Sequence, residues 1–174
     1  MDSELVVLTP ATPSDGVLLS NLLELYIHDL SDIFTQLELG PDGRFGYPRL
    51  PLYFSEPDRR LAYLIRYGSR IAGFALVMRG SPAVEEVDVH DIAEFFVMRR
   101  YRRRGVGRRA ATLLWQQLPG KWTVRVSEGN PAALAFWTRA VAEHTGGKAT
   151  QWTRPGDPRA WRVLYFDSHE PGPG

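Results

Sequence analysis

The chain of 174 residues carries 21 lysines and arginines against 20 aspartates and glutamates, a formal net charge of +1, and it contains no cysteine. This length fits one domain with a substantial core, and the lack of cysteine excludes a disulfide framework, a thiolate metal site and a cysteine nucleophile. The near-neutral charge gives no reason to expect nucleic-acid binding, no apolar run is long enough to span a bilayer, and the first ten residues lack a secretory pattern. We therefore expect a cytoplasmic monomer or homodimer with no nucleic-acid or membrane partner.

The first half of the chain predicts a strand, a long helix and a hairpin. Residues 5–8 are apolar and β-branched, and residues 15–30 repeat leucine and tyrosine along one helical face, which favours a strand followed by a helix. Two further strands, at residues 60–66 and 71–78, are separated by a short hairpin signal. Residues 79–91 are expected to form a loop.

A segment rich in glycine, proline and aromatic residues spans residues 40–57. Its aromatic side chains, Tyr47 and Tyr53 among them, are too apolar to be exposed to water without cost. A long aromatic loop within one domain is typical of a binding loop or a lid. The structural alternative is a loop that only covers the sheet.

The prediction is organised around the segment from Asp91 to Leu118. Residues 92–98 form an apolar run of strand length, and residues 106–118 repeat apolar residues at helical spacing. The eleven residues from Arg99 to Arg109 include seven arginines, so the rest of the chain sums to +1 − 7 = −6. A helix start attracts anions through its unpaired N–H groups, and arginine adds bidentate contacts to oxyanions. This turn therefore predicts a site for a pyrophosphate or several phosphates.

Three kinds of phosphate-binding loop compete at this turn. A Walker loop requires Gly-x-x-x-x-Gly-Lys-Ser/Thr, which does not occur in the chain. A dinucleotide fingerprint requires a third glycine where Ala110 stands, and it would follow the first strand of the fold. The pattern that fits is Arg102-x-x-Gly105-x-Gly107 between a strand and an amphipathic helix, and the structural alternative is a solvated basic loop.

The remaining predicted elements are a strand at residues 122–126, a helix at 132–143 and strands at 148–153 and 159–166. Antiparallel pairing early and a strand–helix–strand unit later indicate an α/β fold, with a mixed sheet and helices on both faces. We expect one domain over residues 1–167 and a flexible tail over residues 168–174.

Two patterns resemble the acyl-CoA elements of the GNAT N-acetyltransferase superfamily. The first is Arg102-x-x-Gly105-x-Gly107 after a strand ending at Val97, and the second is Asn130-x-x-Ala133-x-x-Phe136-Trp137. The resemblance implies a single-domain, mostly antiparallel sheet of six to seven strands with a splay between the strands at Val97 and Val126. It also implies acetyl-CoA (coenzyme A) as cofactor, with its pantetheine arm in that gap.

The resemblance also implies which residues hold acetyl-CoA. Main-chain groups of Val97 and Arg99 would pair with the pantetheine amides, and Arg102 to Arg108 would surround the pyrophosphate, with Arg103 or Arg104 at the ribose phosphate. Asn130 is expected either to cap its helix or to reach the cofactor arm. The full set is Phe96, Val97, Arg99, Arg102, Arg103, Arg104, Gly105, Val106, Gly107, Arg108, Asn130, Ala133, Phe136 and Trp137.

The implied reaction moves an acetyl group to a primary amine by direct attack through a tetrahedral intermediate. Since an aliphatic amine is mostly protonated at neutral pH, a base is needed. Glu94, in an apolar stretch that would raise its pKa, is the first candidate, and a structural ion pair is the alternative; Asp91 and His90 are second choices. The N–H of Val97 would stabilise the oxyanion. No histidine spacing suggests a metal.

The acceptor pocket is expected at the end of the first helix, the aromatic loop and the start of the central strand. Its predicted lining, acidic and aromatic, favours a small cationic amine as the substrate. The residues expected to bind that substrate are Tyr26, Asp29, Tyr47, Tyr53 and Glu94, with Asp32 nearby.

One departure from the superfamily pattern concerns the leaving group. The superfamily often places a tyrosine, the acid for the CoA thiolate, where this chain has Trp137, and an indole cannot replace that acid. Tyr101 and Tyr165 are weak substitutes, and unassisted departure of the thiolate is possible because it is a modest base. A non-catalytic acyl-CoA sensor on the same fold is therefore the alternative function.

Overall fold

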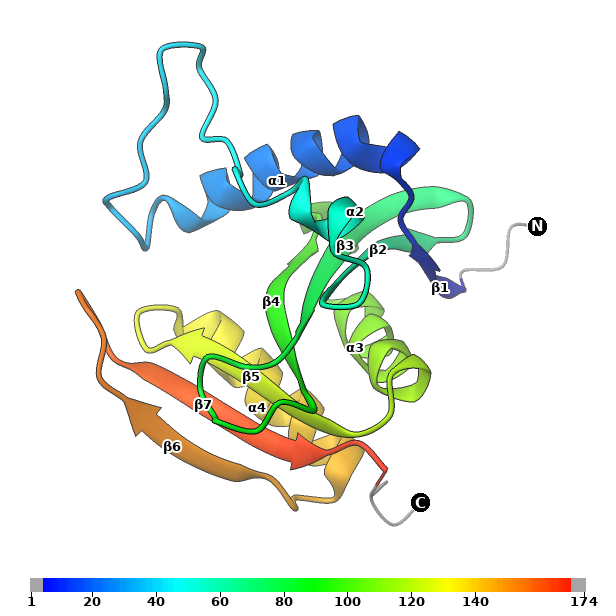
Figure 1. The fold of residues 1–174 in the computed structure, drawn as a ribbon, viewed down its shortest axis with the longest axis vertical. Helices are drawn as coiled ribbons and strands as arrows, with labels where there is room; N and C mark the ends of the chain where they lie inside the picture. The colour runs from blue at the N-terminus through cyan, green and yellow to red at the C-terminus, as the bar shows by residue number, and fades with distance from the viewer. Residues whose placement is uncertain (1–4, 170–174) are drawn as a thin grey trace.

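The computed structural model describes residues 5–169, which form an open seven-stranded sheet with helices on both faces (Figure 1). The strands are β1 (Val6–Pro10), β2 (Arg60–Tyr67), β3 (Arg70–Arg79), β4 (Val89–Val97), β5 (Lys121–Ser127), β6 (Thr150–Arg154) and β7 (Trp161–Asp167). Their order in the sheet is β1-β2-β3-β4-β5-β7-β6. Among these strands β4 and β5 run parallel, and the other neighbours are antiparallel. The predicted α/β class and mostly antiparallel sheet are confirmed.

Two separate cores lie on the two faces of this sheet. The helices are α1 (Gly16–Leu30), α2 (Leu52–Ser55), α3 (Val106–Gln117) and α4 (Pro131–Thr145), with short 3₁₀ turns η1 (Pro13–Asp15) and η2 (Arg99–Tyr101). On one face α1 and α2 pack through Leu19, Leu23 and Tyr53. On the other, α3 and α4 pack through Leu114 and Trp137. Because β3 lies between these layers, all residues from Ala72 to Val77 except Gly73 count among the buried core.

The two parallel strands at the centre of the sheet separate along their length. Pairing of β4 with β5 begins at Val89 opposite Lys121 and ends at Ile92 opposite Val124. Beyond that point β5 stays paired with β7 as far as Ser127, while β4 follows β3. Figure 1 shows the two arrows diverging. The splay expected between the strands at Val97 and Val126 is therefore confirmed.

A β-bulge in β4 lies where the strands separate. Leu76 pairs with Glu94 and Val77 pairs with Ile92, so Ala93 is an extra residue. A bulge bends its strand and shifts the alternation of side chains by one position. Asp91 and Glu94, three residues apart, consequently share the face covered by α1, whereas regular alternation would place them on opposite faces. Nothing in the sequence pattern indicated this bulge.

Three features of the structure were not predicted. β4 starts at Val89, inside the predicted loop of residues 79–91, because the Val89 side chain is buried. The aromatic segment contains the short helix α2, which was not predicted. Ser168, predicted to begin the flexible tail, is buried, and its hydroxyl accepts a hydrogen bond from Gly120 N–H at 3.0 Å. The rest of that tail from residue 170 onward lies outside the described residues.

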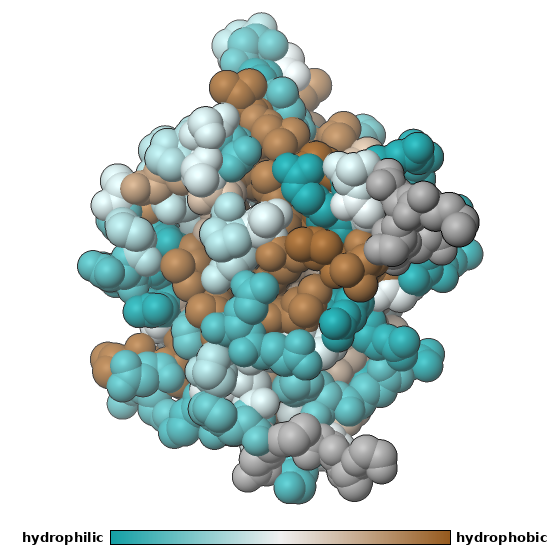
Figure 2. Space-filling model, turned by 90° about the vertical axis from the view of Figure 1, so that its right-hand side faces the viewer, coloured by the Kyte–Doolittle hydropathy of each residue, from teal (hydrophilic) through white to brown (hydrophobic). Residues whose placement is uncertain are grey.

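Apolar side chains also reach the surface near β1. Figure 2 views the molecule from the side on which Figure 1 places β1 and the start of α1, and hydrophobic residues gather in the middle of that face. Leu5, just before β1, Val7 of β1 and Val17 of α1 are among the exposed apolar side chains. This face is separate from the gap between β4 and β5.

We expect Gly73→Ala to destabilise the fold strongly. A methyl group at Gly73 would lie 1.9 Å from the main-chain oxygen of Phe96, so β3 and β4 could no longer approach each other. The free energy of unfolding, measured in urea, should fall by about 3 kcal/mol. Gly16→Ala is the control, because its added methyl would have its nearest neighbour at 3.7 Å. Equal stabilities for the two variants would contradict this account.

Candidate active site

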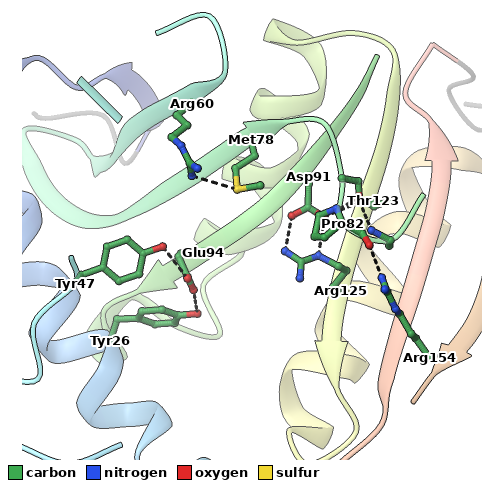
Figure 3. A network of polar contacts seen from close by, with 12 residues as sticks. Tyr26, Tyr47, Arg60, Met78, Pro82, Asp91, Glu94, Thr123, Arg125 and Arg154 are labelled. Carbon is green, nitrogen blue, oxygen red and sulfur yellow. Dashed lines mark hydrogen bonds and ion pairs between the residues drawn. The ribbon is translucent and has the colours of Figure 1, made fainter. Parts of the chain in front are cut away.

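Glu94 forms the centre of the candidate site. The Tyr26 hydroxyl donates to its Oε2 at 2.7 Å, and the Tyr47 hydroxyl donates to its Oε1 at 3.0 Å (Figure 3). Burial raises the pKa of Glu94, and the opposing effect of the two tyrosine hydrogen bonds is smaller. Burial likewise raises the pKa of Tyr26, so its hydroxyl remains a donor. The site thus combines a poorly solvated carboxylate with two fixed donors.

A cavity of about 380 Å³ opens onto Glu94. Its wall comes from the end of α1, the following turn and the aromatic loop, and consists of Tyr26, Ile27, Leu30, Phe34, Gln36, Leu37, Glu38, Phe45, Gly46, Tyr47 and Glu94. Tyr26, Tyr47 and Glu94 were predicted to meet here. The apolar residues between positions 27 and 37 were not predicted to line the cavity. The sequence signal for Phe34 and Leu37 was only that their stretch has no strong polar pattern. The wall of the cavity therefore presents mainly aliphatic and aromatic groups.

The aromatic loop is fixed to α1 by hydrogen bonds. The carboxylate of Glu24 accepts from the N–H of Phe45 at 2.8 Å and from the N–H of Gly46 at 2.9 Å. Arg44 donates to the Ser20 hydroxyl at 2.8 Å. Gly46 has φ of +74°, a conformation that favours glycine at this turn. These contacts hold the wall of the cavity in place and support the binding-loop alternative.

Two residues expected to bind the substrate lie elsewhere. Asp29 contacts Arg99 at 2.7 Å and Arg102 at 2.5 Å; burial opposes its ionisation, yet hydrogen bonds from Arg102 and Arg99 leave its pKa lowered. Asp29 therefore joins α1 to the arginine turn and does not line the cavity. Tyr53 is the buried residue of α2 and belongs to the core on the α1 face of the sheet. Neither Asp29 nor the exposed Asp32 is among the residues that line the cavity.

Asp91 forms a buried ion pair. It accepts from Arg125 at 2.9 and 2.7 Å and from the Thr123 hydroxyl at 2.6 Å (Figure 3). A carboxylate whose oxygens accept these charge-assisted hydrogen bonds holds Arg125 in position. His90 stacks on Trp122 with ring centroids 4.9 Å apart and is not among the residues of the cavity wall. Of the three candidate bases, Glu94 is the one that lines the cavity.

The arginine turn begins α3 with free main-chain donors. Gly105 caps the helix at φ of +75°, and the first helical hydrogen bond runs from Arg109 N–H to the Gly105 oxygen at 2.9 Å. The N–H groups of Val106, Gly107 and Arg108 therefore precede the first intrahelical bond. A Cβ atom added at Gly105 would meet no atom within 4 Å, so the space directly beside this turn is open. This arrangement fits the diphosphate of coenzyme A.

The arginines of the turn have unequal surroundings. Arg99 and Arg102 pair with Asp29, Arg108 pairs with Glu143 at 3.1 Å, and Arg103 and Arg104 are exposed. Arg103 also has φ of 61°, a left-handed conformation. Arg103 and Arg104 are therefore well placed to meet a phosphate without first breaking an ion pair.

The end of β4 presents main-chain groups to the gap. Met98 N–H donates to the Ala72 oxygen at 2.8 Å, so Val97, one residue earlier, directs its own groups away from β3. Arg102 Nε donates to the Val97 oxygen at 2.7 Å. Phe96 differs from the prediction, since its side chain is buried under α1 and its oxygen faces Gly73 of β3.

The second acyl-CoA element is largely structural. Asn130 caps α4 by accepting from Ala133 N–H at 3.1 Å. Phe136 fills the space left by Gly107, where an added Cβ would lie 3.3 Å from its ring. Trp137 is buried, edge-on to Phe95 at 4.9 Å, so it belongs to the core and the expectation that it contacts the cofactor is not supported.

Neither substitute tyrosine lies at the cavity. Tyr101 is buried in the core beneath α3 and α4. The Tyr165 hydroxyl donates to Glu86 at 3.1 Å. Proton donation to the leaving thiolate therefore has no tyrosine candidate at either position.

Solved structures of acetyltransferases share this fold. An acetyltransferase of Thermus thermophilus is 21% identical with a TM-score of 0.65, covering 95% of this chain and 100% of that chain. Spermidine N-acetyltransferase of Vibrio cholerae, solved with CoA and spermine, is 10% identical with a TM-score of 0.66, covering 95% and 96%. A putative streptothricin acetyltransferase of Bacillus anthracis, solved with acetyl coenzyme A, is 14% identical with a TM-score of 0.58, covering 95% and 98%.

The family model of the acetyltransferase (GNAT) family matches residues 23–141, more than half of the chain, so the chain belongs to that family. It is accordingly an acetyltransferase, and acetyl-CoA is the co-substrate of the family. No relative was found among curated proteins. Within residues 5–169, no group of acidic, histidine or cysteine side chains could hold a metal ion. In the same range, no helix is long and apolar enough to cross a membrane.

We expect Asp91→Ala to destabilise the protein by roughly 3–5 kcal/mol, because Arg125 would be left partly buried without its partner. The measurement is urea unfolding. Glu143→Ala is the control; it removes exposed ion pairs to Arg108 and Arg139 and should cost less than about 1 kcal/mol. A stable but inactive Asp91→Ala enzyme would instead return Asp91 to the list of bases.

Proposed function

We propose that the chain transfers the acetyl group of acetyl-CoA to a primary amine bound against Glu94. The observation that carries this proposal is the position of Glu94: a partly buried carboxylate at a cavity, on the part of β4 that has separated from β5. The acceptor cavity and the gap expected to admit the acyl donor thus meet at one strand.

Glu94 would remove the proton that makes the bound amine non-nucleophilic. A carboxylate whose pKa is raised by burial is a better base near neutral pH than an exposed one. The Tyr26 and Tyr47 hydroxyls occupy one position on each oxygen, and a carboxylate has further lone pairs for an ammonium group. The two tyrosines would therefore orient Glu94 without blocking it.

Acetyl-CoA supplies an activated thioester when bound. The amine nitrogen would bond to the thioester carbonyl carbon and the carbon–sulfur bond would break. Of the two protons that the ammonium group loses, one would go to Glu94 and the other to the departing thiolate. The Val97 N–H would stabilise the negative charge that develops on the carbonyl oxygen. The start of α3, with Arg103 and Arg104, would hold the phosphates. Since neither Tyr101 nor Tyr165 lies at the cavity, we infer that neither of them protonates the thiolate.

A non-catalytic acyl-CoA sensor is the second candidate, and one observation favours it: Trp137 stands where many relatives have the acid and is buried in the core. Release of CoA thiol, assayed across a set of amines, separates the two functions. Acetyl-CoA binding without release on any amine would favour the sensor.

The role of Glu94 predicts the behaviour of Glu94→Gln. Loss of a general base should lower kcat/KM by roughly 10²–10⁴-fold and leave the acetyl-CoA dissociation constant unchanged. Because burial raises the pKa of Glu94 above its ordinary value of 4.5, the parent rate should rise with pH along an acid limb above that value, and the limb should flatten in the variant. Glu56→Gln, paired with Arg60 outside the cavity, is the control. An unchanged pH profile would make Glu94 structural.

Acetyl-CoA binding at the arginine turn predicts a difference between two charge reversals. Arg104→Glu should weaken binding at least about tenfold, because a charge-assisted contact to phosphate is replaced by repulsion. Arg109→Glu changes the net charge equally, and it lies after the first helical hydrogen bond, so its effect should be small. Calorimetry measures both dissociation constants. No binding by the parent protein would end the proposal.

A further inference from the structure

We propose that the acceptor is a small primary amine with one positive charge and an apolar body, such as a short alkyl or arylalkyl chain. This inference deepens the proposed function and rests on it. Its basis is the contrast in the cavity between the partly buried carboxylate of Glu94 and a largely apolar wall.

The wall is built from apolar side chains of three segments. Ile27 and Leu30 come from the last turns of α1, Phe34 and Leu37 from the turn that follows, and Phe45 from the aromatic loop. Tyr26 and Tyr47 add aromatic rings, and their hydroxyls are already directed at Glu94. A ligand placed with its ammonium group at Glu94 would therefore have mainly carbon atoms as neighbours, and the other polar side chains of the wall are Gln36 and Glu38.

The charge of the wall matches a single cation. Its two carboxylates are Glu94, which is partly buried, and Glu38, which is exposed, and it includes no lysine or arginine. Asp29, near the end of α1, is paired with Arg99 and Arg102 and adds no unpaired charge to the site. The second carboxylate of the wall, Glu38, is exposed to solvent, where an ion pair contributes little. Elsewhere along the wall a second ammonium group would lie among apolar side chains and lose its hydration without a partner. A ligand carboxylate would find no cation and would be repelled by Glu94.

The wall is also held in shape. Glu24 fixes the Phe45–Gly46 turn through two main-chain hydrogen bonds. Phe34 stacks on Trp161 of β7 with ring centroids 6.1 Å apart, and its N–H donates to the Leu30 oxygen at 2.9 Å. A preformed wall selects by shape and polarity, since it does not rearrange to supply missing polar partners.

The size of the cavity sets the scale of the ligand. Its volume of about 380 Å³ lies near the lower end of the range for small-molecule sites, about 300–1,000 Å³. A short alkylamine or a phenylethylamine fits this scale. A large, polycationic amino sugar would exceed it and would place several charges against the apolar wall.

The test uses matched amines with the intact enzyme, measuring kcat/KM from thiol release and dissociation constants from calorimetry. Pentylamine should exceed ethylamine by about fourfold for each added methylene. Pentylamine should exceed 1,5-diaminopentane, which differs by a second cation, at least about tenfold. 2-Phenylethylamine should exceed phenylalanine, which differs by a carboxylate, by a similar factor. A diamine or amino acid that equals or exceeds its partner would overturn the proposed class.

A pair of variants tests whether the cavity wall is responsible. Leu37→Asp places a carboxylate in the wall and should raise the ratio of diaminopentane to pentylamine at least about tenfold. Leu39→Asp is the matched control, because Leu39 is 58% exposed and lies outside the wall; it should leave the ratio unchanged. Equal ratios in the two variants would show that this cavity does not select the amine.

The two measurements keep the two proposals apart. Thiol release with diamines or amino acids in preference to the apolar monoamines would leave the acetyl transfer standing and refute the substrate class. Binding of the apolar monoamines in the predicted order, with no thiol release on any amine, would support the ligand class and refute the catalytic function. Absence of both binding and release would refute both.

Discussion

The extra residue in β4 is the constraint on which the candidate site depends. Pairing between β4 and β5 stops at Ile92 and Val124, and the unpaired Ala93 follows at once. A bulge bends the strand that carries it and increases its twist, so β4 follows β3 while β5 follows β7. The separation leaves Val97 with main-chain groups that face a gap, and it turns Glu94 toward α1. One inserted residue thus accounts for both the opening expected to admit the acyl donor and the direction of the candidate base.

Asp29 connects the two halves of this site. Its carboxylate holds Arg99 and Arg102 of the turn that precedes α3, and it lies one turn after Tyr26, which bonds to Glu94. Arg102 also donates to the Val97 oxygen. The end of α1, the arginine turn and the splayed end of β4 are therefore one network of charge-assisted hydrogen bonds, which are stronger than neutral ones. The positive charge of the turn is correspondingly smaller than seven arginines suggest.

The sequence was informative where a local pattern determines the structure. The helical repeat after Gly105, the arginines before it and the Asn130 cap each depend on neighbouring residues, and all of these features were predicted. The bulge at Ala93 was not, because it depends on register against β3. The apolar wall was missed for a related reason: Phe34 and Leu37 become a binding surface only when the turn after α1 packs against the aromatic loop. For Tyr53 and Asp29 the opposite error occurred. Both residue types suit a binding site, but Tyr53 packs in the core and Asp29 forms ion pairs.

Asp91 and Glu94 are carboxylates on the same strand, and their different surroundings give them different roles. Both are on the α1 face because of the bulge, yet Asp91 receives two hydrogen bonds from Arg125 and one from Thr123, whereas Glu94 receives only tyrosine hydroxyls and borders a cavity. Asp91 has its charge matched within the protein. Glu94 does not, and burial raises its pKa. A bound ammonium group would supply the missing cation, so the same imbalance that makes Glu94 costly to ionise in the empty cavity favours binding of a singly charged amine there.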